Sequence, residues 1–331
     1  MKILITGGTG FLGQHLARAL LGQGHRVQLL GRDIARVGEL IAAGALPVAA
    51  DLRDRAAVIA ACAGVVAVYH VGALSAQWGR RADFFAINVD GTAAVLEGCR
   101  SHGVRRLIYV SSPSVVFDGR DHRDLTEDAP YPRHFASVYS LTKKLGEDLV
   151  NAAGWCESVI VRPKAIFGPG DRALLPRLIA AARQGRLPQI GAGRNLVDLT
   201  YVENVADALV LALDAEAATG KTYMITNDEH VLLWDVIRSV LRRLGIPANL
   251  RRVPLAAALV AAGLMECRAA LTGREPLLTR YSAAILGRTQ TYDISAARRD
   301  LGYTPRISVA AGIERTLAAL GVVERGDIME R

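Results

Sequence analysis

Apolar segments of strand length alternate with helical patterns over the first half of the chain. The continuous apolar runs that predict β-strands are residues 2–6, 27–30, 45–49, 65–70, 106–111 and 158–162. The segments with helical spacing of apolar residues are 12–23, 56–62, 84–102 and 139–153. Strands that are apolar at every position are typical of parallel sheets covered by helices on both faces. The alternation therefore predicts an α/β fold built on a doubly wound parallel sheet.

The pattern becomes mainly helical after Pro163. The helical segments expected there are 173–184, 203–214, 232–244, 255–272 and 308–320. Short strands are expected near 187–190, 196–201, 222–225 and 289–293. We therefore predict a first domain over residues 1–165, to which some later segments return, and a smaller helix-rich domain over residues 166–331.

The composition is that of a soluble globular protein, with 51% hydrophobic and 22% charged residues among 331. That hydrophobic share excludes a disordered chain, which lacks the apolar surface to offset its ordering entropy. The formal net charge is +8, and only five of the 40 basic residues are lysines. Because the arginines form no basic tail and their doublets lie far apart, we interpret the excess as surface composition. We predict no nucleic-acid partner.

One segment raises the question of a membrane. Residues 255–265 form the longest apolar run, which Glu266 and Arg268 interrupt. A transmembrane helix needs roughly 20 residues, so the run predicts a core helix or a lid over a substrate, with peripheral membrane contact through 255–272 as the alternative. The chain shows no signal-peptide pattern. The four cysteines have no metal-ligand spacing. We expect a cytoplasmic protein, either free or membrane-associated, with reduced core cysteines and no metal.

A glycine-rich turn lies between the first predicted strand and the first helix. Gly7, Gly10 and Gly13 have GxxGxxG spacing, with Phe11 and Leu12 between the last two. Glycine allows a tight turn and close approach of the backbone to a pyrophosphate, which the free N–H groups of the helix N-terminus then bind. At the first strand-to-helix turn of an alternating pattern, this spacing predicts dinucleotide binding.

The end of the second predicted strand bears on the choice of dinucleotide. An acid there binds the ribose 2′-hydroxyl of NAD, whereas an arginine suits the 2′-phosphate of NADP. Gly31 stands at this point and Arg32 follows. We therefore predict NADP(H) in preference to NAD(H), although Asp33 would restore an acid after a shift of one residue. Asp51 and Leu52 end the third strand, where we expect the adenine ring.

A tyrosine and a lysine with YxxxK spacing suggest redox chemistry. Tyr139 and Lys143 lie four residues apart on a predicted helix and hence on one face of it. An ammonium group beside a phenol lowers its pKa, so that the phenol can exchange a proton with an alcohol. Ser112 follows the fifth predicted strand, where a doubly wound sheet binds ligands. We predict Ser112, Tyr139 and Lys143 as the catalytic set, with Ser111 as the competing serine.

Together these residues resemble the extended short-chain dehydrogenase/reductases, and more closely their 3β-hydroxysteroid dehydrogenase branch. The resemblance extends over nearly the whole chain. Segments 114–119 and 195–204 are similar to sterol-4α-carboxylate 3-dehydrogenases. Segments 77–79 and 276–281 are similar to bacterial 2-alkyl-3-oxoalkanoate reductases. Both groups interconvert a β-hydroxy acid and its β-keto acid. One departure is that Gly31-Arg32 stands where the sterol enzymes carry an acid.

The resemblance implies a Rossmann sheet, a homodimer and a set of site residues. Asn88 would organise the backbone. The remaining cofactor contacts would be His70, Gly72, Ala73, Pro163 and Ile166, besides the glycine turn, Arg32, Asp51, Leu52, Tyr139 and Lys143. The candidate substrate contacts are Ser75, Trp78 and Ser114. Arg268, Arg274 and Arg280 lie near the apolar segment, where one of them could meet a carboxylate, although solvated surface charge is the simpler interpretation.

We conclude from the sequence that the chain is an NAD(P)-dependent oxidoreductase acting between a 3-hydroxy and a 3-keto group. Its substrate would be bulky and apolar, either a sterol of the 4-carboxy type or a long-chain β-keto acid, and the alternative assignment is a 2-alkyl-3-oxoalkanoate reductase of olefin synthesis. A nucleotide-sugar epimerase or dehydratase would need the same three catalytic residues. A non-catalytic cofactor sensor is disfavoured because Tyr139 and Lys143 are both present.

Overall fold

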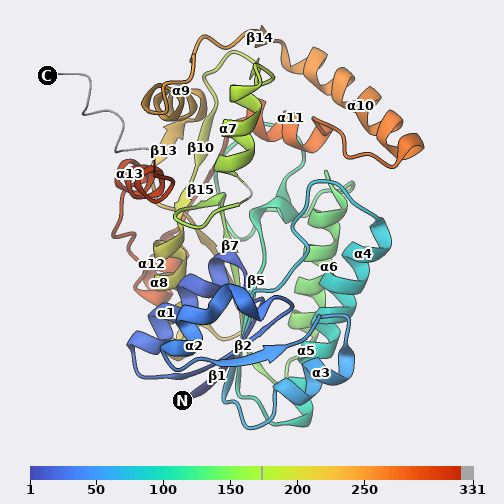
Figure 1. Ribbon diagram of the computed structural model, residues 1–331. Coiled ribbons are helices and arrows are strands. Elements are labelled where there is room, and N and C mark those ends of the chain that lie inside the picture. Colours follow the sequence, from blue (N-terminus) through green and yellow to red (C-terminus); the bar gives the residue numbers. More distant parts are fainter. Residues whose placement is uncertain (173, 322–331) are drawn as a thin grey trace, which may run out of the picture.

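The computed structural model describes residues 1–172 and 174–321, and within them seven parallel strands form the central sheet (Figure 1). Their order is β12-β7-β5-β4-β1-β2-β3. The strands are β1 (Lys2–Thr6), β2 (Arg26–Gly31), β3 (Leu46–Ala49), β4 (Ala67–His70), β5 (Arg106–Val110), β7 (Glu157–Pro163) and β12 (Lys221–Ile225). The order reverses between β1 and β4, which is where a doubly wound sheet binds its ligand. The predicted fold class is confirmed.

Helices cover both faces of the sheet, and alternate strand residues face each layer. Ile3 and Ile5 pack toward one layer and Leu4 toward the other. The first layer contains α1 (Phe11–Gly22), α2 (Gly38–Ala42), α8 (Val202–Asp214) and α12 (Ser295–Leu301). The second contains α3 (Arg55–Ala61), α5 (Gly91–Ser101) and α6 (Val138–Ala152). Burial on both faces explains why the strands read as continuous apolar runs.

A second, mostly helical region lies beyond the carboxyl ends of the strands (Figure 1). Its helices are α7 (Leu175–Arg183), α9 (Leu233–Arg243), α10 (Leu255–Thr272), α11 (Arg280–Gly287) and α13 (Val309–Ala319). Its largest sheet has the order β13 (His230–Leu232), β10 (Leu196–Asp198), β15 (Gln290–Tyr292) and β6 (His122–Leu125). Two short pairs are β8 (Ile166–Phe167) with β11 (Thr200–Tyr201), and β9 (Gln189–Ile190) with β14 (Arg252–Val253). The expected division of the chain at residue 165 stays a prediction.

The structure corrects several expectations. Residues 84–102 do not form one α-helix: α4 (Arg81–Phe85) continues into a π-helical turn, Ala86–Asp90, before α5 begins. Helices α11 and α12 and strand β6 were not expected at all. Cys267 is exposed rather than in the core, although the other three cysteines are buried. The helix expected over 173–184 is α7, while residue 173 lies outside the described residues.

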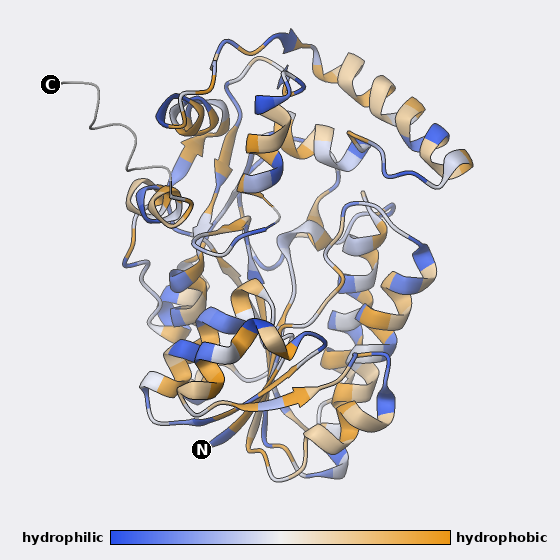
Figure 2. Ribbon diagram, in the orientation of Figure 1, coloured by the Kyte–Doolittle hydropathy of each residue, from blue (hydrophilic) through white to orange (hydrophobic). Residues whose placement is uncertain are grey.

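Helix α10 is apolar but poorly covered by the rest of the molecule (Figure 2). Only 17% of its 18 residues are buried. Val260 is 67% exposed, Leu264 is 69% exposed and Leu271 is 89% exposed. Among the described residues it is the one helix long and apolar enough to cross a membrane. It is therefore not a core helix, and its contact with a membrane stays a prediction, as do the cytoplasmic location and the homodimer.

The composition suggested that the arginines lie on the surface, but at least one of them is buried. Arg106 on β5 is 2% exposed. Its guanidinium donates to the carbonyl oxygens of Ala212 and Ala215 at the end of α8, at 2.8 and 2.6 Å, and to Thr219 Oγ1 at 2.8 Å. The last carbonyls of a helix lack partners within the helix and carry partial negative charge, so a buried cation satisfies both needs.

Replacing Arg106 by methionine should therefore lower the free energy of unfolding by at least about 2 kcal/mol, because buried carbonyls lose their donors. Urea denaturation measures this loss. Arg105→Met is the matched control, since Arg105 is exposed and should change stability by no more than about 0.5 kcal/mol. Equal losses in the two variants would contradict this account of Arg106.

Candidate active site

The glycine turn between β1 and α1 forms a tight backbone cradle. Gly7 has a φ of +66°, and a Cβ atom there would lie 2.6 Å from Gly72 Cα. A Cβ atom on Gly13 would overlap the carbonyl oxygen of Gly7. Helix α1 begins after Gly10, whose residue type offers no side chain to cap its N–H groups. The cradle and the open helix N-terminus fit the pyrophosphate of a dinucleotide.

The other residues predicted around the cofactor surround this turn. Leu52 packs against Gly72, which adjoins Gly7: a Cβ atom on Gly72 would lie 2.9 Å from Leu52 Cδ1 and 3.1 Å from Gly7 N. Leu12 is buried and Phe11 half-buried, with the Phe11 ring edge-on to His15. Ala73 is half-buried, Pro163 ends β7 and Ile166 begins β8. All of these are placed along the carboxyl edge of the sheet, and their contact with the cofactor stays a prediction.

Two arginines converge on one carboxylate at the ends of β2 and β3. Arg53 binds Asp51 through two nitrogen–oxygen contacts of 2.9 and 2.8 Å, and Arg32 Nη1 lies 4.0 Å from Asp51 Oδ2. The hydrogen bond from Arg53 lowers the pKa of Asp51 to about 2. Both guanidinium groups are at least half exposed. The pair therefore presents positive charge to solvent beside the adenosine end of the predicted site.

The structure leaves no room for an acidic side chain at Gly31, the last residue of β2. A Cβ atom at Gly31 would overlap the side chain of Thr9, which occupies that space. Asp33 is turned to Arg36, with 2.6 Å between its Oδ2 and Arg36 Nε. Neither position offers a free carboxylate of the kind that binds a ribose 2′-hydroxyl.

His70 is a structural histidine at the end of β4. Its Nδ1 lies 2.7 Å from Thr6 Oγ1 and its Nε2 lies 3.0 Å from Thr92 Oγ1. Complete burial, reinforced by the nearby charge of Lys143, lowers the pKa of the imidazole to about 3. His70 is therefore neutral with both ring nitrogens engaged. Only its backbone remains to line a cofactor, so the predicted contact stays a prediction.

The structure places Ser112 close to Tyr139 at the carboxyl end of β5, and Lys143 follows Tyr139 one turn later on α6. Ser112 caps the short 3₁₀ turn Pro113–Val116 and accepts a hydrogen bond from Ser114 N at 3.2 Å. Burial raises the pKa of Tyr139 to about 12, and the Ser112 hydroxyl lies close enough to counteract this rise. The competing residue Ser111 has a buried Oγ without a hydrogen-bond partner among the described residues. Because Ser112, and not Ser111, lies close enough to Tyr139 to lower its pKa, the geometry favours Ser112 over Ser111.

Lys143 is 1% exposed, and two neighbouring side chains stabilise its buried ammonium group. Burial lowers the pKa of Lys143 to about 7, and the carboxylate of Glu147 one helical turn later opposes this shift. The ammonium Nζ lies over the Tyr109 ring, 3.9 Å from its centroid, where the negative face of the ring favours the charged form. Gly146 leaves room for this ring, because a Cβ atom there would overlap Tyr109 Oη.

Asn88 organises the backbone between the sheet and α6, as the resemblance implied. Its Oδ1 accepts from Leu74 N at 2.7 Å, and its Nδ2 donates to Leu74 O at 3.1 Å and to Thr142 Oγ1 at 3.0 Å. Asn88 lies in the π-helical turn, so this departure from α-helical geometry places the amide against the loop after β4. The turn thereby fixes α6, which carries Tyr139 and Lys143.

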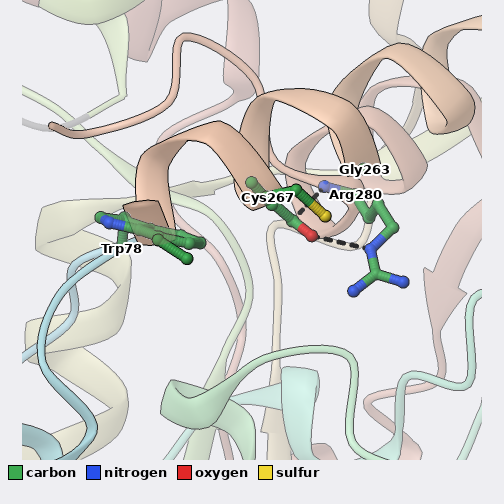
Figure 3. Close-up of a pocket in the computed structure, with 6 residues that line it drawn as sticks. Trp78, Gly263, Cys267 and Arg280 are labelled. Carbon is green, nitrogen blue, oxygen red and sulfur yellow. Dashed lines mark hydrogen bonds and ion pairs between the residues drawn. The ribbon is translucent and has the colours of Figure 1, made fainter. Parts of the chain in front are cut away.

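An apolar pocket of about 520 Å³ opens at Tyr139. It extends to α10 and α11, and a second hollow of about 400 Å³ adjoins it at Trp78, Glu266 and Arg280 (Figure 3). Arg280 Nε on α11 lies 2.7 Å from Glu266 Oε2 on α10, so an ion pair links the two helices. Besides Tyr139, the apolar and aromatic side chains that line the larger pocket are Trp78, Phe84, Phe117, Phe135, Ala136, Val138, Leu259, Tyr281 and Ala284.

The predicted substrate residues are distributed unevenly around this pocket. Trp78 lines it, Ser75 is exposed and does not, and Ser114 is buried behind it. Among the three arginines considered for a carboxylate, Arg280 lines the pocket and is already paired with Glu266.

Sequence analysis missed four residues that shape the site. Tyr109 and Gly146 support Lys143, Glu147 balances its charge, and Tyr281 closes the pocket. Glu147 lies on the same helix face as Lys143, so its spacing was a usable signal.

Comparisons with known proteins agree with this geometry. Residues 4–255 match the model of the 3-beta hydroxysteroid dehydrogenase/isomerase family. This chain belongs to that family. It is 39% identical to the 2-alkyl-3-oxoalkanoate reductase of Stenotrophomonas maltophilia, over 96% of this chain and 99% of that protein. It is 35% identical to the sterol-4-alpha-carboxylate 3-dehydrogenase, decarboxylating, of Mus musculus, over 96% and 90%.

Solved structures support the fold. The UDP-glucose 4-epimerase of Thermotoga maritima superposes with a TM-score of 0.79 over 97% of this chain and 99% of that one, at 18% identity. At that identity the likeness concerns the fold alone. Membership of the family, together with the site geometry, makes the chain an NAD(P)-dependent oxidoreductase.

Proposed function

We propose that this enzyme reduces the 3-oxo group of a bulky, apolar 2-alkyl-3-oxo acid to the 3-hydroxy acid. The observation that carries the proposal is Tyr139, which lines an apolar and aromatic pocket and has the Ser112 hydroxyl close to it. Two relatives that act on different skeletons, an alkyl chain and a sterol, both have names that combine an oxygen function at carbon 3 with a carboxylate. The bacterial reductase has the higher identity, which favours the alkyl acid.

The chain's own residues account for the proton in this reaction. The bound nicotinamide would supply a hydride to the carbonyl carbon. Tyr139 Oη would donate its proton to the carbonyl oxygen, which Ser112 Oγ would hold in place. Lys143, one helical turn after Tyr139 on α6, would stabilise the resulting tyrosinate and bind the cofactor ribose. Apolar walls exclude water, so these polar groups act in a medium that strengthens their interactions.

The pocket is poorly suited to the rival substrate, a nucleotide sugar. A diphosphate requires several cations or free N–H donors. Among the described residues that line the pocket, Arg280 is the sole cation and is paired with Glu266. Apolar side chains dominate the remaining wall, which suits an alkyl chain or a sterol ring system.

Turnover of a substrate panel tests the proposal. The panel contains a long-chain 2-alkyl-3-hydroxy acid, a 4-carboxy-3-hydroxysterol and a UDP-sugar, each offered with NADP⁺ and with NAD⁺. We expect the alkyl hydroxy acid to be oxidised with the highest kcat/KM. Preferential oxidation of the sterol would move the assignment to the sterol enzymes. Turnover of the UDP-sugar without oxidation of either acid would overturn the proposal.

We also propose that NADP(H) is the preferred cofactor. Arg32 and Arg53 face solvent on either side of Asp51, so a 2′-phosphate bound near them would meet two guanidinium groups. The filled space at Gly31 and the pairing of Asp33 with Arg36 support the same choice.

Arg32→Ala should raise the KM for NADPH about tenfold, since one charge-assisted hydrogen bond contributes roughly 1.5 kcal/mol at an exposed site. The KM for NADH should stay within about twofold, because NADH has no 2′-phosphate. Initial-rate kinetics with each cofactor measures both values. Arg36→Ala, which removes an arginine paired with Asp33, is the matched control and should leave both unchanged. If Arg32→Ala left the KM for NADPH unaltered, the assignment of the phosphate contact would fail.

A further inference from the structure

Two hydroxyl groups outside the predicted catalytic set lie near Tyr139: Tyr281 lines the pocket, and Ser114 is buried next to Tyr281. Tyr281 lines the same pocket as Tyr139, and its phenol is near enough to Tyr139 for a negative charge on one to raise the pKa of the other. Ser114 follows Ser112 by two residues and is 7% exposed. Its hydroxyl lies near the Tyr281 phenol and lowers the pKa of Tyr281, which burial has raised.

Ser114 Oγ is a buried polar atom that forms no hydrogen bond of normal geometry with any described residue. Burial without a partner costs roughly 1–3 kcal/mol, so such an atom in a folded enzyme needs an explanation. Ser114 lies next to Tyr281, which lines the pocket, so a ligand bound at Tyr281 could supply the missing partner.

Tyr281 is held rigidly, which a recognition residue requires. It is the second residue of α11, whose first turn is fixed by a capping box between Thr279 and Ser282. Glu266 on α10 accepts a hydrogen bond from Arg280 N at 2.7 Å, directly before Tyr281. The ring also packs edge-on against Phe117, with 6.1 Å between the centroids. These contacts leave the phenol little freedom other than to face the pocket.

We propose that Ser114 and Tyr281 bind the carboxylate of the substrate and select for 3-hydroxy and 3-oxo acids over simple alcohols and ketones. This inference rests on the proposed function. In a β-keto acid the carboxyl carbon is two bonds from the ketone carbon. A ketone oxygen held by Tyr139 and Ser112 therefore places the carboxylate against the immediately neighbouring donors, and those are Ser114 and Tyr281.

The two hydroxyl donors match the two oxygens of the carboxylate in number. A carboxylate accepts hydrogen bonds and donates none, whereas a serine and a neutral tyrosine each donate one. Burial keeps Tyr281 neutral, because it raises the pKa of the phenol. Arg280, the cation of the pocket lining, is occupied by Glu266 at the mouth. The carboxylate thus has hydroxyl donors at the reacting end and no competing ion pair there.

The test compares three substrates of equal chain length: a 2-alkyl-3-hydroxy acid, its methyl ester and the secondary alcohol without the carboxyl group. Oxidation of each by NADP⁺ is measured for the wild-type enzyme, Tyr281→Phe and Ser114→Ala. We expect each substitution to lower kcat/KM for the acid at least about tenfold, the effect of one lost hydrogen bond to a charged group. The kcat/KM values for the alcohol should change by less than about twofold.

Several outcomes would overturn the inference. An equal loss for acid and alcohol would assign Tyr281 and Ser114 to the alcohol group or to packing, and unchanged turnover of the acid would assign them no role. A loss as large for the ester as for the acid would show that the pair recognises a carbonyl rather than a carboxylate. Tyr303→Phe is the matched control, since it removes a buried phenol that donates to Thr226 O outside the pocket.

Failure of the proposed function is distinguishable from failure of this inference. If the wild-type enzyme oxidised neither acid nor alcohol, the proposed function itself would fall before any variant was compared. NADPH binding by Tyr281→Phe and Ser114→Ala, measured by fluorescence, should equal that of the wild type and shows that both variants are folded.

Discussion

The buried ammonium of Lys143 is the constraint around which the carboxyl edge of the sheet is built. A lysine that is 1% exposed loses most of its hydration, and the pKa near 7 expresses that cost. The Tyr109 ring beneath it and Glu147 one turn away recover part of the loss. Glu147 in turn is buried, and Arg162 binds it through two contacts of 2.8 and 2.7 Å. The buried cation of Lys143 thus accounts for the burial of Glu147 near it and of Arg162 against Glu147.

The site has two parts with different functions: polar groups around Lys143 and apolar walls supplied by α10 and α11. Below the pocket, the polar groups around Lys143 belong to the sheet and to α6, which are rigid because they pack on both layers. Above it, α10 and α11 supply apolar walls, and α10 itself is largely exposed. The groups that handle the proton therefore lie on α6 and the sheet it packs against, while the substrate contacts lie on helices that can vary without disturbing them. This division accounts for relatives with different substrate skeletons on one fold.

The sequence predicted the features that depend on neighbours along the chain. Strand periodicity, the glycine turn and the Tyr139–Lys143 spacing are local signals, and all seven strands of the central sheet were predicted within a few residues of their observed ends. The π-helical turn was not predicted because its residues keep helical periodicity while the hydrogen-bond pattern changes. The role of Tyr281 in the pocket and the burial of Arg106 were not predicted for another reason. Both depend on contacts between segments far apart in sequence, for which the chain carries no periodic signal.

The account predicts one chemical event, the transfer of hydride to carbon 3 coupled to a proton from Tyr139. The most direct measurement is single-turnover transfer of deuterium from C4 of labelled NADPH to a 2-alkyl-3-oxo acid, followed by mass spectrometry. The wild-type product should carry one deuterium on carbon 3. Tyr139→Phe should slow the transfer at least about 100-fold while still binding NADPH, because general acid catalysis contributes that much. Transfer by Tyr139→Phe at the wild-type rate, or a wild-type product without deuterium on carbon 3, would contradict the account.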